Sequence, residues 1–421
     1  MQQNTARRAS IILGVFMAIV LIAGAILPLF GNSSTTTVNP TVTPVATSTF
    51  PPPITDFSGL NFDQYYLHTN GMFAVPQPPG WDSASPSATV SEAVINMTNG
   101  AALSVIDTRI ERAVGGMTPE ELDAHFTQER LGETWANFDA RGWEETDRRM
   151  EGDRLVLDFL VTFQGRRFVA RQISFTDGTW VFSARVLAPE NATALVAHIV
   201  AQYPDRFIRF AQFDGTPIDW QSYYDHTFRH IVRFPADWLI ADSAPGRLAS
   251  ITGTSGESLR VYGVTGDPLA DEAAASAWLT STRPGATVLS VVPVTRGELS
   301  GFSVAYAFTN ADGEPLSGAA VVLNGEGVLH VADLYFFAQD IDLNTVDLSA
   351  EAEADAEATP EATGEVADAF GSISGAAGVV DDGTQANTIR YATILSTFSL
   401  LPPLNLSAAS LPAPTPTLVP T

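Results

Sequence analysis

The stretch FDQYYLHT, residues 62–69, decides the fold because it returns further along the chain as WQSYYDHT, residues 220–227. Each copy then runs through an apolar stretch to a proline and a tryptophan. The first copy reads FAVP up to Pro76, and the second reads IVRFP up to Pro235. The same order of predicted elements follows both stretches, so the sequence predicts a duplicated domain.

In the first copy, Ala102–Ile110 alternates as a strand and is followed by Thr118-Pro119-Glu120-Glu121. A threonine N-cap, a proline at the first helical position and a glutamate three residues after the cap together predict a helix start. Further on, large apolar residues occupy the odd positions of Leu155–Phe163. That period of two is typical of a strand with one buried face.

A hairpin and a closing helix complete the first copy. Phe168–Phe175 and Trp180–Leu187 read as strands joined through Asp177-Gly178, a dipeptide that predicts a type I′ turn. Apolar residues then recur at helical spacing over residues 192–203.

The second copy repeats this order. Ser258–Val264 reads as a strand, and Asp271–Thr282 is an alanine-rich helical run. Asn324-Gly325 separates two further strand-like stretches, which again predicts a type I′ hairpin. The closing helix is expected around Tyr391–Phe398.

Short hairpin connections make each sheet mainly antiparallel, and two helices per copy must cover it to bury its apolar residues. We therefore expect an α+β fold: two tandem α/β/α sandwich domains, over residues 57–213 and 214–405, preceded by one N-terminal transmembrane helix.

The Tyr-Tyr-x-His-Thr opening, the apolar run ending in Pro and Trp, and this element order resemble the PsbP-like family, named after the extrinsic subunit P of photosystem II. The resemblance covers both copies. It implies an α/β/α sandwich in each copy and a non-catalytic binding or assembly role. No metal ligands of the family can be matched to residues of this chain.

An uncharged apolar segment over residues 10–30 is long enough to cross a bilayer. Arg7 and Arg8 precede it, so residues 1–9 are expected in the cytoplasm and the bulk of the chain outside it, at the cell membrane. The alternative is a signal peptide cleaved after Ala23-Gly24-Ala25. Cleavage there would leave apolar residues at the new end, so we expect a permanent single-pass anchor.

Three segments lack the composition of a packed core. Residues 31–56 are rich in Thr and Pro and predict an extended stalk, and residues 406–421 form a Pro-rich disordered tail. Acidic residues alternate with Ala, Gly and Thr over about residues 345–386. Such a segment cannot offset its ordering entropy, so we expect a disordered insert within the second domain.

Composition excludes several classes of function. The formal net charge of -25 disfavours nucleic acid as a partner, because nucleic acids attract basic patches. The chain has no cysteine, which excludes disulfides and a lipid-modified cysteine, and no lysine, which excludes Schiff-base and phosphate-loop lysines.

A search for catalytic or metal motifs gives no catalytic residue, no metal site and no cofactor. The chain holds no Gly-x-Ser-x-Gly and no zinc-protease helix motif. His226 and His230 are four residues apart, but they read as a strand entry, where such positions lie about 13 Å from each other. We therefore expect ordinary surface histidines there.

Tyr66, His68, Tyr224 and His226 recur between the copies and are the candidate binding residues. The competing interpretation is packing, with each tyrosine at a strand start and each histidine bonded to a nearby turn. We give packing more weight, because duplication of a fold alone explains the recurrence.

The expected function is a membrane-anchored, extracytoplasmic, non-enzymatic binding or assembly module. Its partner would be an envelope protein or a small ligand. Two alternatives remain: a structural spacer of the cell envelope, and an acid/base hydrolase that uses two carboxylates in a cleft.

Overall fold

The computed structural model describes residues 50–136, 142–163, 165–337 and 382–407. The chain divides into two compact units. The first comprises the residues up to Tyr66 together with Val75–Ile208, and the second comprises Leu67–Ala74 together with the chain from Arg209 onward. Within the described ranges, no helix is long and apolar enough to span a bilayer.

Several predicted segments lie outside the described residues. These are the cytoplasmic end, the transmembrane helix 10–30, most of the stalk, most of the acidic insert and nearly all of the tail. The described part of the insert differs from its prediction, because helix α6 (Asp382–Ser396) begins inside it.

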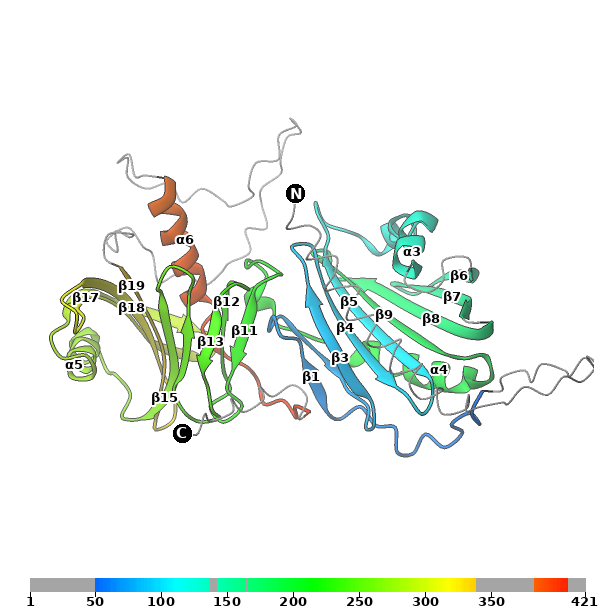
Figure 1. Cartoon of the computed structure of the whole chain (residues 1–421), viewed down its shortest axis with the longest axis horizontal. Helices are drawn as coiled ribbons and strands as arrows, with labels where there is room; N and C mark the ends of the chain where they lie inside the picture. Colours follow the sequence, from blue (N-terminus) through cyan, green and yellow to red (C-terminus); the bar gives the residue numbers. More distant parts are fainter. Residues whose placement is uncertain (1–49, 137–141, 164, 338–381, 408–421) are drawn as a thin grey trace, which may run out of the picture. The chain divides into compact units, whose positions relative to one another are not determined.

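The first unit is built on a seven-stranded antiparallel sheet in the order β3-β4-β5-β9-β8-β7-β6 (Figure 1). The strands are β3 (Asp82–Ala88), β4 (Glu92–Asn99), β5 (Ser104–Arg112), β6 (Trp143–Glu151), β7 (Arg154–Phe163), β8 (Arg166–Thr176) and β9 (Trp180–Pro189).

The second unit repeats this strand order as β13-β14-β15-β19-β18-β17-β16. The strands are β13 (Leu239–Asp242), β14 (Ala249–Thr252), β15 (Ser258–Thr265), β16 (Thr287–Arg296), β17 (Leu299–Thr309), β18 (Pro315–Asn324) and β19 (Val328–Phe337). The equal orders of the two sheets agree with a duplicated domain.

Two small sheets accompany the large ones. One joins β1 (Tyr65–Leu67), β2 (Phe73–Pro76) and β10 (Ile208–Arg209). The other joins β11 (Gln221–Tyr224), β12 (His230–Phe234) and β20 (Ser399–Leu400). The repeated stretches that open each copy therefore start the small sheets.

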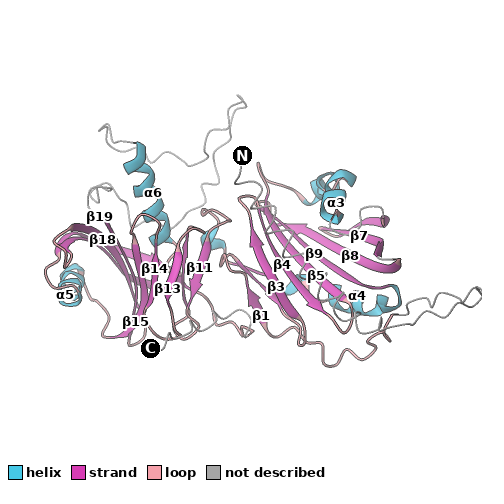
Figure 2. Ribbon diagram, in the orientation of Figure 1, coloured by secondary structure: helices cyan, strands magenta, loops and turns pink. Residues whose placement is uncertain are grey.

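Helices cover both faces of the first sheet (Figure 2). On one face lie the 3-10 turn η2 (Pro119–Glu121) and the helices α2 (Leu122–His125) and α3 (Gln128–Trp135). On the other lies α4 (Thr193–Val200), after which the Tyr203 hydroxyl bonds Thr108 Oγ1 at 2.9 Å.

The second sheet is covered in the same way. Helix α5 (Glu272–Thr282) packs on the face that carries Tyr306 and Ala320. Helix α6 packs on the opposite face, against Ala319 and Val321. Neighbouring positions of β18 thus serve opposite faces, as the pleat of a strand requires. Both units are rich in antiparallel sheet and hold few helices.

The packing explains the strongest sequence patterns. Leu155, Leu157, Phe159 and Val161 of β7 are buried under the first unit's helices, which confirms the predicted strand. Its other face is partly covered as well, because Val156 is also buried. The predicted helix start is also confirmed. Glu121 Oε2 accepts a hydrogen bond from the backbone N–H of Thr118 at 2.8 Å and completes the capping box.

The two hairpins form where predicted, but their turns are not of type I′. That type needs positive φ at both central residues. In the first hairpin only Gly178, with φ of 96°, has it, and in the second only Gly327, with φ of 69°. In the first hairpin, Asp177 Oδ1 accepts a hydrogen bond from the backbone N–H of Trp180 at 2.8 Å. Asp177 is therefore the first residue of the turn and not one of its two central residues.

The sheets are wider than predicted, chiefly because edge strands have atypical sequences. Edge strand β6 reads WEETDRRME and carries charges along its length. Edge strand β16 contains Pro293 and a register shift between Val288 and Ser290. Charges, prolines and bulges are the devices that keep an exposed edge from pairing, and they hide such strands from a search for alternating apolar residues.

Candidate functional site

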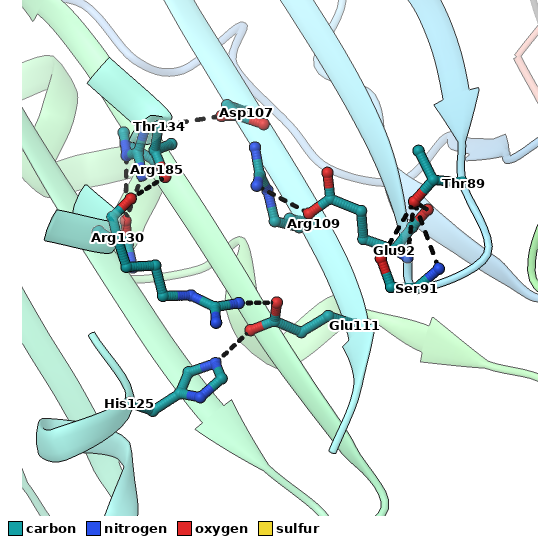
Figure 3. Close-up of polar contacts among 11 residues, drawn as sticks. Thr89, Ser91, Glu92, Asp107, Arg109, Glu111, His125, Arg130, Thr134 and Arg185 are labelled. Atoms are coloured by element: carbon teal, nitrogen blue, oxygen red, sulfur yellow. Dashed lines mark hydrogen bonds and ion pairs between the residues drawn. The ribbon is translucent and has the colours of Figure 1, made fainter. Parts of the chain in front are cut away.

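Polar side chains gather on the first sheet beneath α2 and α3 (Figure 3). They come from alternate positions of β5, which share one face of the sheet, from β4, β8 and β9, and from the two helices. We call this group the polar cluster. Its members are Glu92, Asp107, Arg109, Glu111, His125, Arg130, Thr134, Gln172, Ser183 and Arg185.

Arg185 is the buried centre of the polar cluster, with 8% of its surface exposed. Its Nε and Nη2 atoms donate to Gln172 Oε1 at 3.1 and 2.7 Å. The guanidinium carbon lies 4.3 Å from the ring centroid of Trp135, a cation–π contact. The Arg185 guanidinium thereby links strand β8 to helix α3.

The pairing of Arg185 with its acid is loose. Arg185 Nη1 lies 3.8 Å from Asp107 Oδ2, and Asp107 Oδ1 is buried with no hydrogen-bond partner in the described part of the chain. Burial lowers the pKa of Arg185 to about 10, although the charge of Asp107 opposes this and that of Arg109 adds to it. The guanidinium stays charged at neutral pH but is incompletely neutralised.

Glu111 is the most tightly held acid of the cluster. It accepts from Arg130 and lies 2.5 Å from His125 Nε2. Burial raises its pKa, but the hydrogen bond from His125 and the charge of Arg130 outweigh burial, so the pKa of Glu111 is lowered. Glu111 is therefore ionised at neutral pH.

The outer arginines lie closer to solvent. Arg109 Nη1 donates to Glu92 Oε2 at 2.9 Å, and the Arg109 side chain is 27% exposed. The Arg130 side chain is 38% exposed. Burial lowers the pKa of Arg109, but Asp107, Glu92 and Glu111 together raise it above its ordinary value.

These side chains surround a cavity of about 20 Å³. That volume suits one water molecule with several polar partners, and the orphaned Asp107 Oδ1 is an acceptor for one. A second depression, of about 540 Å³, lies on the α4 side. Its lining includes the apolar Val156, Ile173 and Val200 and the charged Arg154 and Arg171.

The cluster's chemistry suits recognition of charge. Three arginines face three carboxylates. The pKa of Glu111 is lowered, whereas a carboxylic acid that donates protons at neutral pH needs a raised pKa. Among the described residues, no group of three or more His, Asp or Glu side chains is placed to hold a metal ion.

The four residues predicted from the repeat lie outside both cavities. Tyr66 and His68 are buried, and His68 Nδ1 accepts from the backbone N–H of Asn70 at 3.0 Å. Tyr224 is also buried, which raises its pKa, whereas His226 is exposed. The buried tyrosines and the turn contact of His68 are those that the packing interpretation describes, whereas the exposed His226 does not fit it.

The backbone register also changes which residues correspond between the copies. The N–H of His68 donates to Phe73 O, and the N–H of Asp225 donates to His230 O, both at 3.0 Å. His68 is therefore the counterpart of Asp225, not of His226. Asp225 Oδ1 accepts from the N–H of Thr227 at 2.7 Å, the same turn contact that His68 makes to the residue two positions ahead.

The expectation of surface histidines fails at His230, which is fully buried. It is the first residue of β12 and its side chain enters the core of the second unit.

Sequence reasoning missed the polar cluster, although a signal for it exists. In the stretch SVIDTRIER, residues 104–112, charged residues alternate with apolar ones in a strand that helices cover on both faces. A lone arginine, Arg185, also interrupts the buried run of β9. Charges on a covered face must pair, so the two patterns together point to an ionic cluster.

No known protein family and no curated protein matches the sequence. Among solved structures, the chain is similar to cyanobacterial PsbP (CyanoP) from Synechocystis sp. PCC 6803. The sequences are 16% identical, the match covers 29% of this chain and 82% of that one, and the TM-score is 0.24. A second similar structure is the immunity protein TplEi of the T6SS from Pseudomonas aeruginosa, with 14% identity, 84% and 99% coverage and a TM-score of 0.20.

Proposed function

We propose that this chain is a membrane-anchored, extracytoplasmic, non-enzymatic binding or assembly module built from tandem PsbP-like domains. In this proposal residues 10–30 are the anchor, and the polar cluster of the first unit is the binding site. The observation that carries it is the pair of half-exposed arginines, Arg109 and Arg130, set above the buried Arg185.

The two outer arginines are accessible to a partner. Arg109 and Arg130 each bond an internal carboxylate, Glu92 and Glu111, while part of each guanidinium side chain remains open to solvent. The Arg109–Glu92 pair, in which both side chains are partly exposed, contributes little to stability, so a carboxylate of a partner can replace Glu92 at small cost. Arg130 keeps its bond to the buried Glu111 and can offer its exposed side to the same partner. The planar fork of an arginine gives such a contact its geometry. The proposed partner is an envelope protein or a small ligand that presents an acidic group.

The hydrolase alternative has less support. A glycosidase-like pair needs one carboxyl group whose pKa is raised so that it carries a proton at working pH. Glu111 has the opposite shift, because His125 and Arg130 stabilise its charged form.

The test is capture of a partner by the full chain, held in detergent micelles, from an envelope extract. We expect Arg130→Gln to reduce capture at least tenfold, the cost of one charge-assisted hydrogen bond of about 1.5–3 kcal/mol. Arg167→Gln is the matched control, because Arg167 is an exposed arginine of the same sheet that pairs with Glu190 at 3.2 Å.

Equal capture by wild type and Arg130→Gln would show that the polar cluster is not the binding site. Failure of all three proteins to capture a partner would favour the spacer alternative. That alternative makes its own prediction: deleting a unit should matter no more than shortening the stalk by the same reach.

A further inference from the structure

His230 lies in an aromatic enclosure in the second unit that leaves its ring without hydrogen bonds. The ring centroid is 5.7 Å from that of Phe228, 5.9 Å from that of Phe398 and 6.1 Å from that of His330. Neither nitrogen of His230 has a partner in the described part of the chain, and the same holds for His330 Nδ1. We call His230 and His330 the histidine pair.

Packing alone does not require an imidazole at this position. The backbone register makes Phe73 the counterpart of His230 in the other copy, and both side chains are fully buried. A phenyl ring fills such a site without any polar atom, whereas a buried nitrogen without a hydrogen bond costs about 1–3 kcal/mol. The second copy bears this cost at a position where the first does not.

The backbone of His230 and its neighbour holds the last described strand in place. His230 and Ile231 of β12 pair with Leu400 and Ser399 of β20. The N–H of Leu401 donates to Arg229 O at 2.9 Å. Arg229 has a φ of 60°, a left-handed conformation that is uncommon for residues with a side chain.

A proton on His230 would find no free acceptor. The titratable and charged groups around it are Tyr223 and Asp225 from β11 and its turn, Arg229 from the same turn, and His330 from β19. Asp225 is the acid of this set, and its two carboxylate oxygens already accept from the backbone N–H groups of Thr227, Phe228 and Gly246. His330 disfavours an imidazolium at His230, and Arg229 disfavours one at His330.

We propose that the histidine pair makes the pairing of β12 with β20 sensitive to acid, so that protonation of His230 releases β20 together with the turn at residues 225–229. The second copy thereby holds a titratable side chain at a position where the first copy has Phe73.

The direction of the effect follows from the titration of His230. Burial lowers the pKa of His230 from 6.5 in the open form to about 4 in the closed form. Asp225 opposes this shift and His330 adds to it. Above pH 6.5 both forms are neutral and the closed form keeps its full stability. As the pH falls from 6.5 toward 4, only the open form takes up the proton, so the closed form loses stability. Burial and Arg229 also lower the pKa of His330, which acts in the same direction.

Hydrogen exchange on the full chain in detergent micelles tests the proposal. The reporters are the N–H groups of Leu401 and Asp225, which donate to Arg229 O and His230 O. Their protection factors, which already correct for the intrinsic effect of pH on exchange, should fall about 30-fold between about pH 7.5 and about pH 5.

His230→Phe should reduce this fall to the smaller part that His330 contributes, and the counterpart Phe73 shows that the position accepts a phenyl ring. His226→Phe, at an exposed histidine of the same turn, should leave the fall unchanged. Unchanged protection in the wild type, or an equal fall in His230→Phe, would overturn the proposal. If His230→Phe does not fold, His330→Phe decides, because removing the second imidazole should make the fall smaller; an equal fall would count against the proposal.

Discussion

Arg185 on β9 and Asp333 on β19 occupy the same position in two sheets of equal strand order, yet they carry opposite charges. Each is the sixth residue of its strand. Arg185 lies opposite Asp107 of β5, and Asp333 lies opposite Arg260 of β15. The duplicated sheets thus keep a charged pair across the same two strands and exchange its signs.

The surroundings of the two positions differ more than the positions themselves. Asp333 binds Arg283 and the hydroxyl of Tyr306. The Arg283 guanidinium lies 5.1, 4.5 and 4.8 Å from the ring centroids of Tyr306, Phe308 and Tyr335. Aromatic rings therefore close the charged site of the second unit, whereas the first unit retains a water-sized cavity. This difference is the reason for assigning binding to the first unit.

Arg185→Met should lower the free energy of unfolding by about 1–3 kcal/mol, because it removes the donor to the buried Gln172 and the nearby cation of Asp107. Adding Asp107→Asn should recover part of the loss. Urea unfolding of the full chain, followed by tryptophan fluorescence, measures the change. Arg167→Met, at an exposed ion pair, should cost less than about 1 kcal/mol. Equal costs at the two sites would show that Arg185 is not structural.

Tyr306→Phe should destabilise the second unit by about 1–3 kcal/mol, because Asp333 loses a buried hydrogen-bond donor. Tyr335→Phe is the matched control, since its ring also contacts Arg283 but its hydroxyl makes no hydrogen bond to a described residue. Thermal unfolding of the two variants compares them. A cost at Tyr335 as large as that at Tyr306 would contradict the assigned role of the hydroxyl.

Gly301→Ala should destabilise the second unit by about 1–3 kcal/mol through overpacking. A Cβ atom at Gly301 would lie 1.9 Å from the backbone oxygen of Val322, which belongs to the paired strand β18 and cannot move aside. Gly100→Ala meets no atom within 4 Å and should change stability by less than about 0.5 kcal/mol. The midpoints of urea unfolding give both values.

Acid should weaken the first unit through Glu111. Its pKa is lower in the folded chain than the ordinary value of 4.5, so its ionised form contributes stability above pH 4.5. That contribution disappears as the pH falls from 4.5 through the lower folded value. Glu111→Gln should therefore be less stable than wild type at neutral pH and should show a weaker acid dependence below 4.5.

Unfolding measured at several pH values tests this prediction. Glu190→Gln, a half-exposed carboxylate of the same unit, should keep the acid dependence of the wild type. A Glu111→Gln variant with the wild-type pH profile would show that Glu111 is not stabilised in its charged form.

How much the sequence could predict depended on which force sets each feature. The strand at Leu155–Phe163 and the capping box at Thr118 were predictable, because burial period and cap chemistry are local. The edge strand β6 was not predictable, because its charged side chains contact solvent and neighbouring side chains and do not pack into a core. Its place follows from pairing with β7, which is a long-range contact.

The candidate residues show the same limit. His68 and His226 correspond when the two sequences are aligned. The backbone hydrogen bonds instead match His68 to Asp225, the residue before His226. A shift of one residue moves a strand's side chains to the other face, so sequence alignment alone could not separate the buried residue from the exposed one. The side chains of the polar cluster come from four strands, β4, β5, β8 and β9, and from two helices, and only the fold brings these elements together.

The unlike edges of the two sheets have a consequence for how the chain folds. Two similar domains on one polypeptide meet at millimolar effective concentration, and mispairing between repeats is a characteristic failure of such chains. A strand edge of charges, as in β6, and one interrupted by Pro293, as in β16, offer each other few hydrogen bonds and no matched apolar face. The different edge strands therefore disfavour pairing between the two sheets while each copy forms its own sheet.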